Sequence, residues 1–266
     1  MPVARPLLVE HFRDLYRYRA LIDSLVRREV QARYRRSMLG YLWTLLNPLL
    51  LLLVYLMVFT RFTRAVDLPG YALFLFVGIL PWLWLNSAIT NGATSIVLGG
   101  GLITRVCMPP QVLPAVAVLS NLVNFLLGLP IAVAAALLAG VRPGAALLLL
   151  PAAIGVQLVF LYGAALLAAT LTVRFRDVQF LAQNLLLVWF FLTPIAFPIG
   201  MVPDRYRPLI NANPATALIR PFQQILFEGR APDPSELALG TAWALALLLA
   251  AVHLFESMRD GLAEEI

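Results

Sequence analysis

Side chains able to perform chemistry are few in this chain, and their spacing fits no common catalytic or metal-binding pattern. Asp177 and Glu236 lie at the edges of long apolar runs, and the interiors of these runs contain no acidic residue. The two histidines, His11 and His253, are far apart in the sequence and cannot form a metal site alone. A single cysteine, Cys107, excludes an internal disulfide and CxxC chemistry.

The chain also shows no energy source of its own. Glycines 99–101 do not belong to a GxxxxGK[ST] phosphate-binding loop. Proton- or sodium-coupled carriers usually place ionisable groups at membrane depth, and the apolar runs here offer none. No cofactor is therefore expected in this chain, and neither is a metal.

Amides and aromatic side chains remain as candidates for binding. Asn121 and Asn124 share one helical face, at i and i+3, while Gln183, Asn184 and Gln157 lie within later apolar runs. These amides either hydrogen-bond a hydroxylated cargo or bond between helices, as buried amides in helical bundles commonly do.

Three aromatic residues of the first apolar run lie within about 40° of each other on a helix, because successive residues are rotated by about 100°. They are Tyr41, Tyr55 and Phe59. Such a stripe stacks well on sugar rings. The alternative is an interfacial aromatic belt, which suits Tyr41 and Phe59 at the ends of the run better than Tyr55.

The composition predicts a polytopic membrane protein. The chain has 266 residues, of which 61% are hydrophobic and 13% charged, whereas soluble domains carry about 25% charge. The formal charge of +6 comes from arginine alone, since the sequence contains no lysine. The arginines cluster at the predicted membrane boundaries, which indicates topology signals and lipid-headgroup contacts, not nucleic-acid binding.

An arginine cluster precedes the first apolar run, which has no charge from Leu39 to Thr60. The cluster consists of Arg27, Arg28, Arg33, Arg35 and Arg36. Apolar runs of about 20 residues span a bilayer as helices, so we expect an all-α integral membrane fold with six transmembrane helices. The predicted spans are 39–60, 71–91, 112–138, 145–173, 178–197 and 237–256.

The arginine distribution orients these spans. Nine arginines precede the first span and two follow it before the second. Positive charge favours the cytosolic side, and an even number of spans places both ends together. We therefore predict that both termini of this multi-pass membrane protein are cytoplasmic.

The chain divides into a cytosolic segment (1–38), a six-span domain (39–256) and a cytosolic tail (257–266). Residues 7–36 show amphipathic helical spacing, which predicts one helix lying in the membrane interface or, alternatively, packed on a protein partner. Residues 92–111 are expected to form a cytosolic connection with a short helix at 101–107, ended by Pro109 and Pro110.

Residues 198–236 are too polar to span a membrane and too apolar for a free loop. Within this outer segment, Pro203, Pro208, Pro214 and Pro221 separate short pieces. Short helices that re-enter the membrane and pack within protein fit the pattern, and a surface helical hairpin is the alternative.

Four motifs carry a resemblance to one family. They are RREVQARYRRSMLGYLWTLLNPLLLLLVYLMVF at 27–59, GLITRVCMPPQVLP at 101–114, RFRDVQFLAQNLLLVWFFLTPIAFP at 174–198 and NPATALIRPFQQILFEG at 213–229. In this order they resemble the permease subunits of type-2 ABC exporters, and in particular those that export lipid-linked polysaccharide such as O-antigen, capsule or teichoic acid.

The resemblance implies partners and roles. A second copy of the permease and two ATP-binding cassette subunits are implied, with ATP and Mg held by the latter and a lipid-linked glycan as the cargo. The cytosolic connection would dock on the ATPase through Leu102, Arg105, Met108, Pro109 and Pro110. The two permeases would enclose a channel lined partly by the first and fifth spans, for which the candidates are Tyr41, Tyr55, Phe59, Asn121, Asn124, Gln183 and Asn184.

Two other functions stay open at this point. One is a type-2 ABC permease for drugs or small lipids. The other is an intramembrane enzyme of lipid or glycan metabolism, for which the sequence offers only Asp177 with Arg174 and Arg176 nearby.

Overall fold

The computed structural model describes residues 7–35, 40–62, 68–106 and 108–265, and within these residues the chain is helical with no strand. The elements are α1 (Leu7–Arg17), α2 (Arg19–Tyr34), η1 (Gly40–Leu42), α3 (Trp43–Leu56), η2 (Met57–Phe62), α4 (Tyr71–Val106), α5 (Val112–Leu138), η3 (Gly144–Leu149), α6 (Leu150–Arg174), α7 (Val178–Phe191), η4 (Ile199–Met201), α8 (Arg207–Ala212), α9 (Pro214–Leu226) and α10 (Pro234–Glu265). The prediction of an all-α fold is confirmed.

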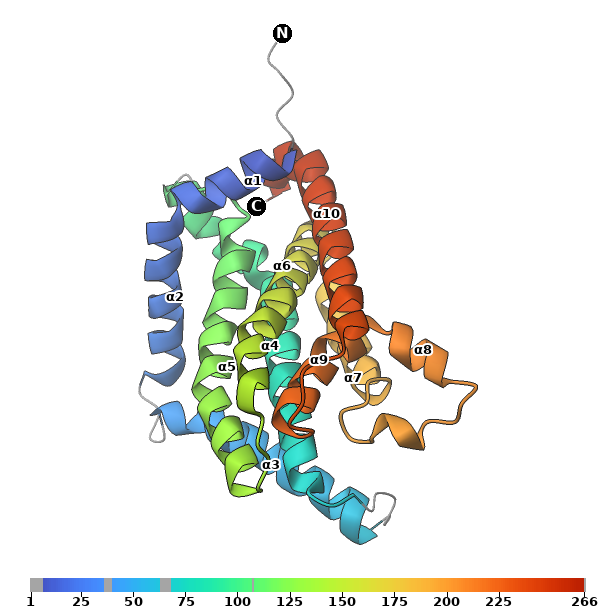
Figure 1. Cartoon of the computed structure of the whole chain (residues 1–266). Coiled ribbons are helices and arrows are strands. Elements are labelled where there is room, and N and C mark those ends of the chain that lie inside the picture. Colours follow the sequence, from blue (N-terminus) through green and yellow to red (C-terminus); the bar gives the residue numbers. More distant parts are fainter. Residues whose placement is uncertain (1–6, 36–39, 63–67, 107, 266) are drawn as a thin grey trace.

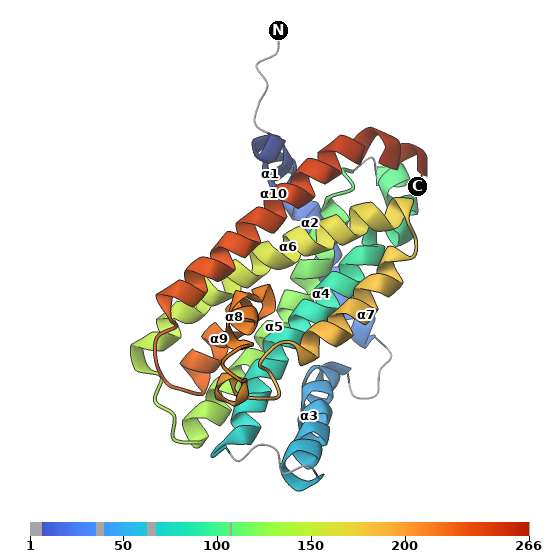
Figure 2. The ribbon, with the colours of Figure 1, turned by 90° about the vertical axis from the view of Figure 1, so that its right-hand side faces the viewer.

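Four of the described helices are long and apolar enough to cross a bilayer. They cover Tyr71–Leu102, Val112–Leu138, Gly144–Arg174 and Pro234–Arg259, and two shorter apolar helices cover Leu46–Phe59 and Val178–Phe191. Each of the six overlaps one predicted span, although Tyr71–Leu102 extends well beyond the predicted 71–91 and Leu46–Phe59 and Val178–Phe191 are shorter than predicted. The long helices α4, α5, α6 and α10 run side by side along the length of the molecule (Figures 1 and 2).

Small residues allow the long helices to approach closely. A Cβ placed on Gly163 of α6 would lie 3.0 Å from the backbone of Leu248 in α10, and one on Gly92 of α4 would lie 2.5 Å from the Cβ of Ala165. Helices in membranes associate largely through such backbone proximity, since lipid is as apolar as the side chains. These glycines therefore bring α4, α6 and α10 together.

The expectation of a separate short helix at 101–107 is wrong. Helix α4 continues without interruption from Tyr71 to Val106. Glycine lowers helix stability but does not end a helix, and Gly99 lies so close to Leu113 of α5 that a Cβ would meet its Cδ1 at 2.3 Å. The helix ends just before Pro109 and Pro110, as predicted.

The amphipathic segment predicted as one helix forms two helices, α1 and α2, which are separated at Tyr18. Helix α1 crosses one end of the bundle, and α2 turns to run alongside the first part of α5 (Figure 1). Ile22 of α2 is buried in a cluster with Met108, Val112 and Val116. Tertiary contact with α5 therefore determines the direction of α2.

A buried polar cluster holds α1 against the bundle. His11 is fully buried, with Nδ1 3.2 Å from Glu256 Oε1 of α10 and Nε2 2.6 Å from the Tyr162 hydroxyl of α6. Asp14 accepts hydrogen bonds from Gln111 and Arg259, both at 3.4 Å. With the proton on Nδ1, a neutral His11 donates to Glu256 and accepts from Tyr162. The cluster places α1 and the last part of α10 at the same end of the molecule.

We expect acid to loosen α1. Burial lowers the pKa of His11 from its ordinary value of 6.5, against the opposing effect of Glu256. The neutral ring is favoured in the docked state, so docking is stable above pH 6.5 and weakens as the pH falls toward the lowered pKa. Hydrogen exchange of α1 amides should increase between about pH 7 and pH 5.5, relative to a His11→Gln variant measured at each pH. His253→Gln, which changes an exposed histidine, is the matched control, and an identical pH response in His11→Gln would contradict the prediction.

The first predicted span, 39–60, consists of three helical pieces, η1, α3 and η2. Pro48 lies inside α3, and η2 is a π-helical turn. Helix α3 lies near the end of the bundle opposite α1 (Figures 1 and 2). Its outward face carries exposed apolar side chains, including Leu49, Leu53 and Val54.

The predicted outer segment at 198–236 contains η4, α8 and α9. Every residue of α9 from Ala215 to Leu226 is buried, so this helix packs within the protein and is not part of a surface hairpin. Asn213 caps α9 by accepting from the amide of Ala215 at 3.0 Å and also accepts from Trp189 Nε1 of α7 at 2.6 Å. One side chain thereby starts α9 and fixes it to α7.

Candidate functional site

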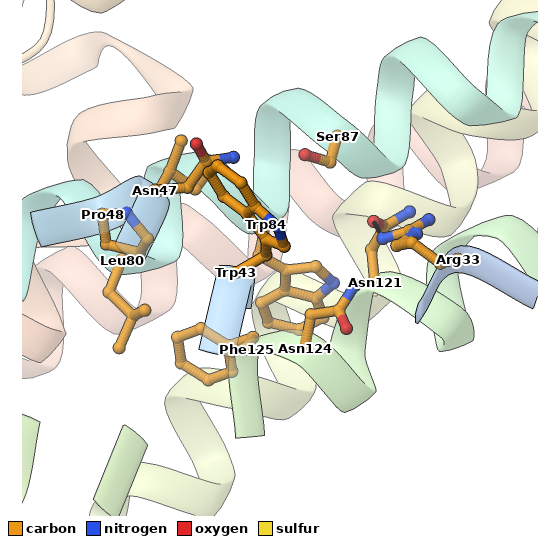
Figure 3. Close-up of a pocket in the computed structure, with 11 residues that line it drawn as sticks. Arg33, Trp43, Asn47, Pro48, Leu80, Trp84, Ser87, Asn121, Asn124 and Phe125 are labelled. Atoms are coloured by element: carbon orange, nitrogen blue, oxygen red, sulfur yellow. Dashed lines mark hydrogen bonds between the residues drawn. The ribbon is translucent and has the colours of Figure 1, made fainter. Parts of the chain in front are cut away.

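A polar cavity of about 420 Å³ lies between α2, α3, α4 and α5, and Figure 3 shows the side chains around it. It is lined by Arg33, Trp43, Asn47, Pro48, Leu80, Leu83, Trp84, Ser87, Asn121, Asn124 and Phe125. Asn121 lies nine residues after the start of α5, which is about 14 Å along the helix. One arginine and three asparagines therefore line a cavity between helices that are otherwise strongly apolar.

Arg33 and Asn121 form the central contact of this cavity. The Nη1 of Arg33 donates to Asn121 Oδ1 at 3.0 Å, and Asn121 Nδ2 donates to the Ala117 carbonyl of its own helix at 2.8 Å. The second bond fixes the orientation of the amide, so its oxygen faces Arg33. Asn121, predicted as a binding residue, therefore bonds between helices and lines a cavity at the same time.

A carboxylate lies behind the guanidinium. Glu29 Oε1 is 3.5 Å from Arg33 Nη2, and Glu29 Oε2 accepts from the hydroxyl of Ser120 at 3.2 Å. Glu29 does not line the cavity. The Arg33 side chain is 31% exposed, so part of the guanidinium remains accessible to a ligand.

Aromatic rings form one wall of the polar cavity. Trp84 and Phe125 stack with ring centroids 5.0 Å apart, and the Trp84 Nε1 donates to the Val118 carbonyl at 3.5 Å. Trp43 is 42% exposed. A rigid aromatic surface beside amides and a guanidinium suits a ligand that combines sugar-like rings with anionic groups.

A second cavity, here called the α3 groove, meets the polar cavity at Asn47. It has a volume of about 480 Å³ and is lined by Asn47, Leu50, Leu51, Val54, Tyr55, Val58, Phe59 and Phe191. Tyr55 and Phe59, two of the predicted stripe residues, stack with centroids 6.0 Å apart. The side chain of Tyr41, the third, lies outside the described residues.

The remaining predicted amides lie elsewhere. Gln183 and Asn184 are exposed on α7 and line neither cavity, and Asn184 Nδ2 donates to the Phe180 carbonyl of its own helix at 2.9 Å. Gln157 Nε2 donates to the carbonyl of Pro81 in α4 at 2.9 Å, so for Gln157 the interhelical alternative holds.

The predicted interface arginines separate in the structure. Arg27, Arg28 and Arg35 are exposed, and Arg27 pairs with Asp23 at 2.9 Å, whereas Arg33 lines the cavity. Arg36 lies outside the described residues.

The predicted docking residues surround the end of α4. Met108 is buried against α2, while Leu102, Pro109 and Pro110 are half-buried. The side chain of Arg105 lies outside the described residues.

Sequence reasoning missed several residues of the site, namely Trp43, Asn47, Trp84 and Ser87, and it gave Arg33 no role apart from its neighbours. One signal was available: Asn47 is a polar residue in the middle of the first apolar run. Glu256 was also missed as a buried partner, because it stands at the last position of a predicted span.

Four long apolar helices and two shorter ones, packed as one bundle, define a multi-pass membrane protein. The family described as ABC-2 type transporter matches residues 20–227. The chain therefore belongs to the ABC-2 type transporter family. It is a transport subunit without an ATPase domain of its own, which removes the intramembrane-enzyme alternative.

Curated relatives agree with this assignment. The chain is 41% identical to the O-antigen export system permease protein RfbA of Myxococcus xanthus, over 97% of this chain and 100% of the relative. It is 31% identical to RfbA of Klebsiella pneumoniae, over 79% and 81% of the two chains. The polysialic acid transport protein KpsM of Escherichia coli is 21% identical over 91% of this chain and 94% of its own length.

Proposed function

We propose that this chain is the permease subunit of an ABC system that exports O-antigen-like, lipid-linked polysaccharide across the bacterial inner membrane. Similarity to O-antigen export permeases over nearly the whole chain supports this function. The structural observation that carries it is the polar cavity, in which amides, tryptophans and an arginine face one space. A permease for apolar drugs has no need for such a lining.

The proposed topology has six spans, with α3 and α7 as the two short ones. The cytosolic segment would cover 1–38, the six-span domain 39–256 and the tail 257–266. The position of α1 and the last part of α10 at one end of the bundle supports both termini on one side. The arginine distribution supports the cytosolic side, and the burial of α9 within protein supports a re-entrant role for 198–236.

The working unit is proposed to be two copies of this chain with two ATP-binding cassette subunits, which hold the ATP and Mg. The exposed apolar side chains of α3 and α7 would face lipid or the second copy. A channel between the copies would be lined by Tyr41, Tyr55, Phe59, Asn121, Asn124, Gln183 and Asn184. The end of α4, at 101–110, would contact the ATPase.

Purification of the complex from native membranes tests this function. Mass spectrometry is expected to find an ATP-binding subunit at equal stoichiometry and a co-purified glycan lipid. Deletion of the gene should leave lipid-linked glycan inside the cell and reduce the glycan on the cell surface. A protein that purifies without any ATPase, in a strain whose surface glycan is unchanged by the deletion, would contradict the proposal.

Charge reversal at the docking position should uncouple the complex. Arg105→Glu is expected to reduce ATPase co-purification at least about tenfold, since a buried interfacial charge contact contributes 2 kcal/mol or more. Arg205→Glu, in the segment before α8, is the matched control and should leave assembly unchanged. Normal assembly and normal export in Arg105→Glu would show that docking lies elsewhere.

A further inference from the structure

We infer that the polar cavity and the α3 groove form one binding site within a single copy of this chain, and that this site holds the phosphate-bearing head and the start of the chain of a lipid carrier. The phosphate group would contact Arg33, and the hydrocarbon would lie along α3. This inference rests on the proposed function, because it assigns the cargo's carrier a place on the permease.

The two cavities adjoin at Asn47, which lines both. Along α3 the lining continues from Trp43 and Asn47 to Leu50 and Leu51, then Val54 and Tyr55, then Val58 and Phe59. These positions recur every three to four residues, so they form one face of the helix. From Asn47 to Phe59 this face extends about 18 Å, and its chemistry changes from polar to apolar along that length.

The polar end is suited to an anion. Arg33 is the charged residue among those lining the polar cavity, and a guanidinium presents five N–H donors that match phosphate oxygens. Its contacts with Asn121 and Glu29 engage only part of that capacity. Asn124 and Ser87 add polar groups around the same space, as Figure 3 shows.

The apolar end explains why the ligand is a lipid phosphate and not a free phosphate ion. Apart from Asn47, the groove is lined by aliphatic and aromatic side chains, which stabilise a hydrocarbon and offer nothing to an inorganic ion. A further groove between α6, α7 and α10, of about 530 Å³, contains no charged or amide side chain among its lining residues. That groove therefore cannot select a phosphate. The polar cavity and the α3 groove together offer both a cation for the phosphate and an apolar surface for the hydrocarbon.

Glu29 gives the inference a second, opposite consequence. Its carboxylate competes with a phosphate for the Arg33 guanidinium from 3.5 Å away. Removing this negative charge should strengthen phosphate binding, while removing the Arg33 charge should weaken it. If Arg33 and Glu29 only held the structure together, removing either charge would weaken phosphate binding.

Binding of undecaprenyl phosphate to the purified full-length protein in detergent tests the inference, with tryptophan fluorescence as the signal because Trp43 and Trp84 line the cavity. Arg33→Gln is expected to weaken binding about tenfold, Arg33→Lys to retain most of it, and Glu29→Gln to tighten it severalfold. Arg27→Gln is the matched control, because Arg27 and Asp23 form an exposed i, i+4 pair on the same helix. Thermal unfolding of each variant verifies that the fold is retained.

Two probes separate the possible ligands. Undecaprenol without phosphate should bind at least about tenfold more weakly, and inorganic phosphate alone should neither bind nor compete at millimolar concentration. Equal binding by Arg33→Gln and Arg27→Gln would overturn the inference, and so would equal affinity for the alcohol. These results are independent of ATPase co-purification. If the complex exports glycan but lipid binding does not depend on Arg33, the site proposed here is refuted and the proposed function stands.

Discussion

Replacing Gly163 by leucine is expected to destabilise the helical bundle strongly. The added side chain would begin 3.0 Å from the backbone of Leu248 in α10, where no rotamer change relieves the clash. Among the described residues α6 and α10 form the most extensive helix pair, so their separation would disturb much of the core. We expect a loss of about 3 kcal/mol or more, measured as a lower Tm and lower yield of monodisperse protein in detergent.

Gly155 provides the matched control on the same helix. A Cβ at that position meets no atom within 4 Å, so Gly155→Leu should leave the Tm within a few degrees of wild type. If Gly163→Leu retained the wild-type Tm, the close approach of α6 and α10 would not be a feature of the folded protein.

Replacing Arg220 by alanine is expected to have the second largest effect. Arg220 Nη1 donates to Glu228 Oε1 at 3.1 Å, and Arg220 Nε lies 3.6 Å from Glu236 Oε1. The guanidinium is 89% buried and connects α9 with the first turn of α10. Its removal would leave two partly buried carboxylates close together, which should cost about 2–3 kcal/mol and lower the Tm by roughly 5–10 °C.

A double variant distinguishes the loss of charge pairing from simple loss of packing. Arg220→Met with Glu228→Gln keeps volume and removes an opposing charge, so it should recover part of the lost stability. Arg230→Ala, at a half-exposed partner of Glu228, should change the Tm by only a few degrees. Equal destabilisation by Arg220→Met alone and by the double variant, which share the same side chain at position 220, would contradict the ion-pair explanation.

Hydrophobic runs and prolines made much of the fold predictable from sequence. Every predicted span overlaps an apolar helix, because a run of about 20 apolar residues between polar flanks has few alternatives to a helix. Pro109 and Pro110 predicted the end of α4, because proline cannot continue a helix. The predicted break before residue 101 failed because α4 continues through the glycines, and Gly99 packs against Leu113 of α5.

The site was less predictable. Asn121 and Asn124 were identified as polar residues within a span, but their meeting with Arg33 depends on α2 turning at Tyr18 to follow α5. No local pattern encodes that turn; the burial of Ile22 against Met108 and Val112 determines it. The joining of two cavities at Asn47 likewise depends on where α3 lies relative to α4 and α7.

The sequence by itself determined the class of protein, the helical spans and the family, since these follow from composition, hydrophobic run length and ordered local motifs. The tertiary structure alone decided which of many arginines and amides act together. The reason is physical: membrane insertion depends on local hydrophobicity, whereas a binding site depends on the packing of helices from distant parts of the chain. Arg33 therefore resembles its neighbours in the arginine cluster until α2 packs against α5 and places its guanidinium beside Asn121.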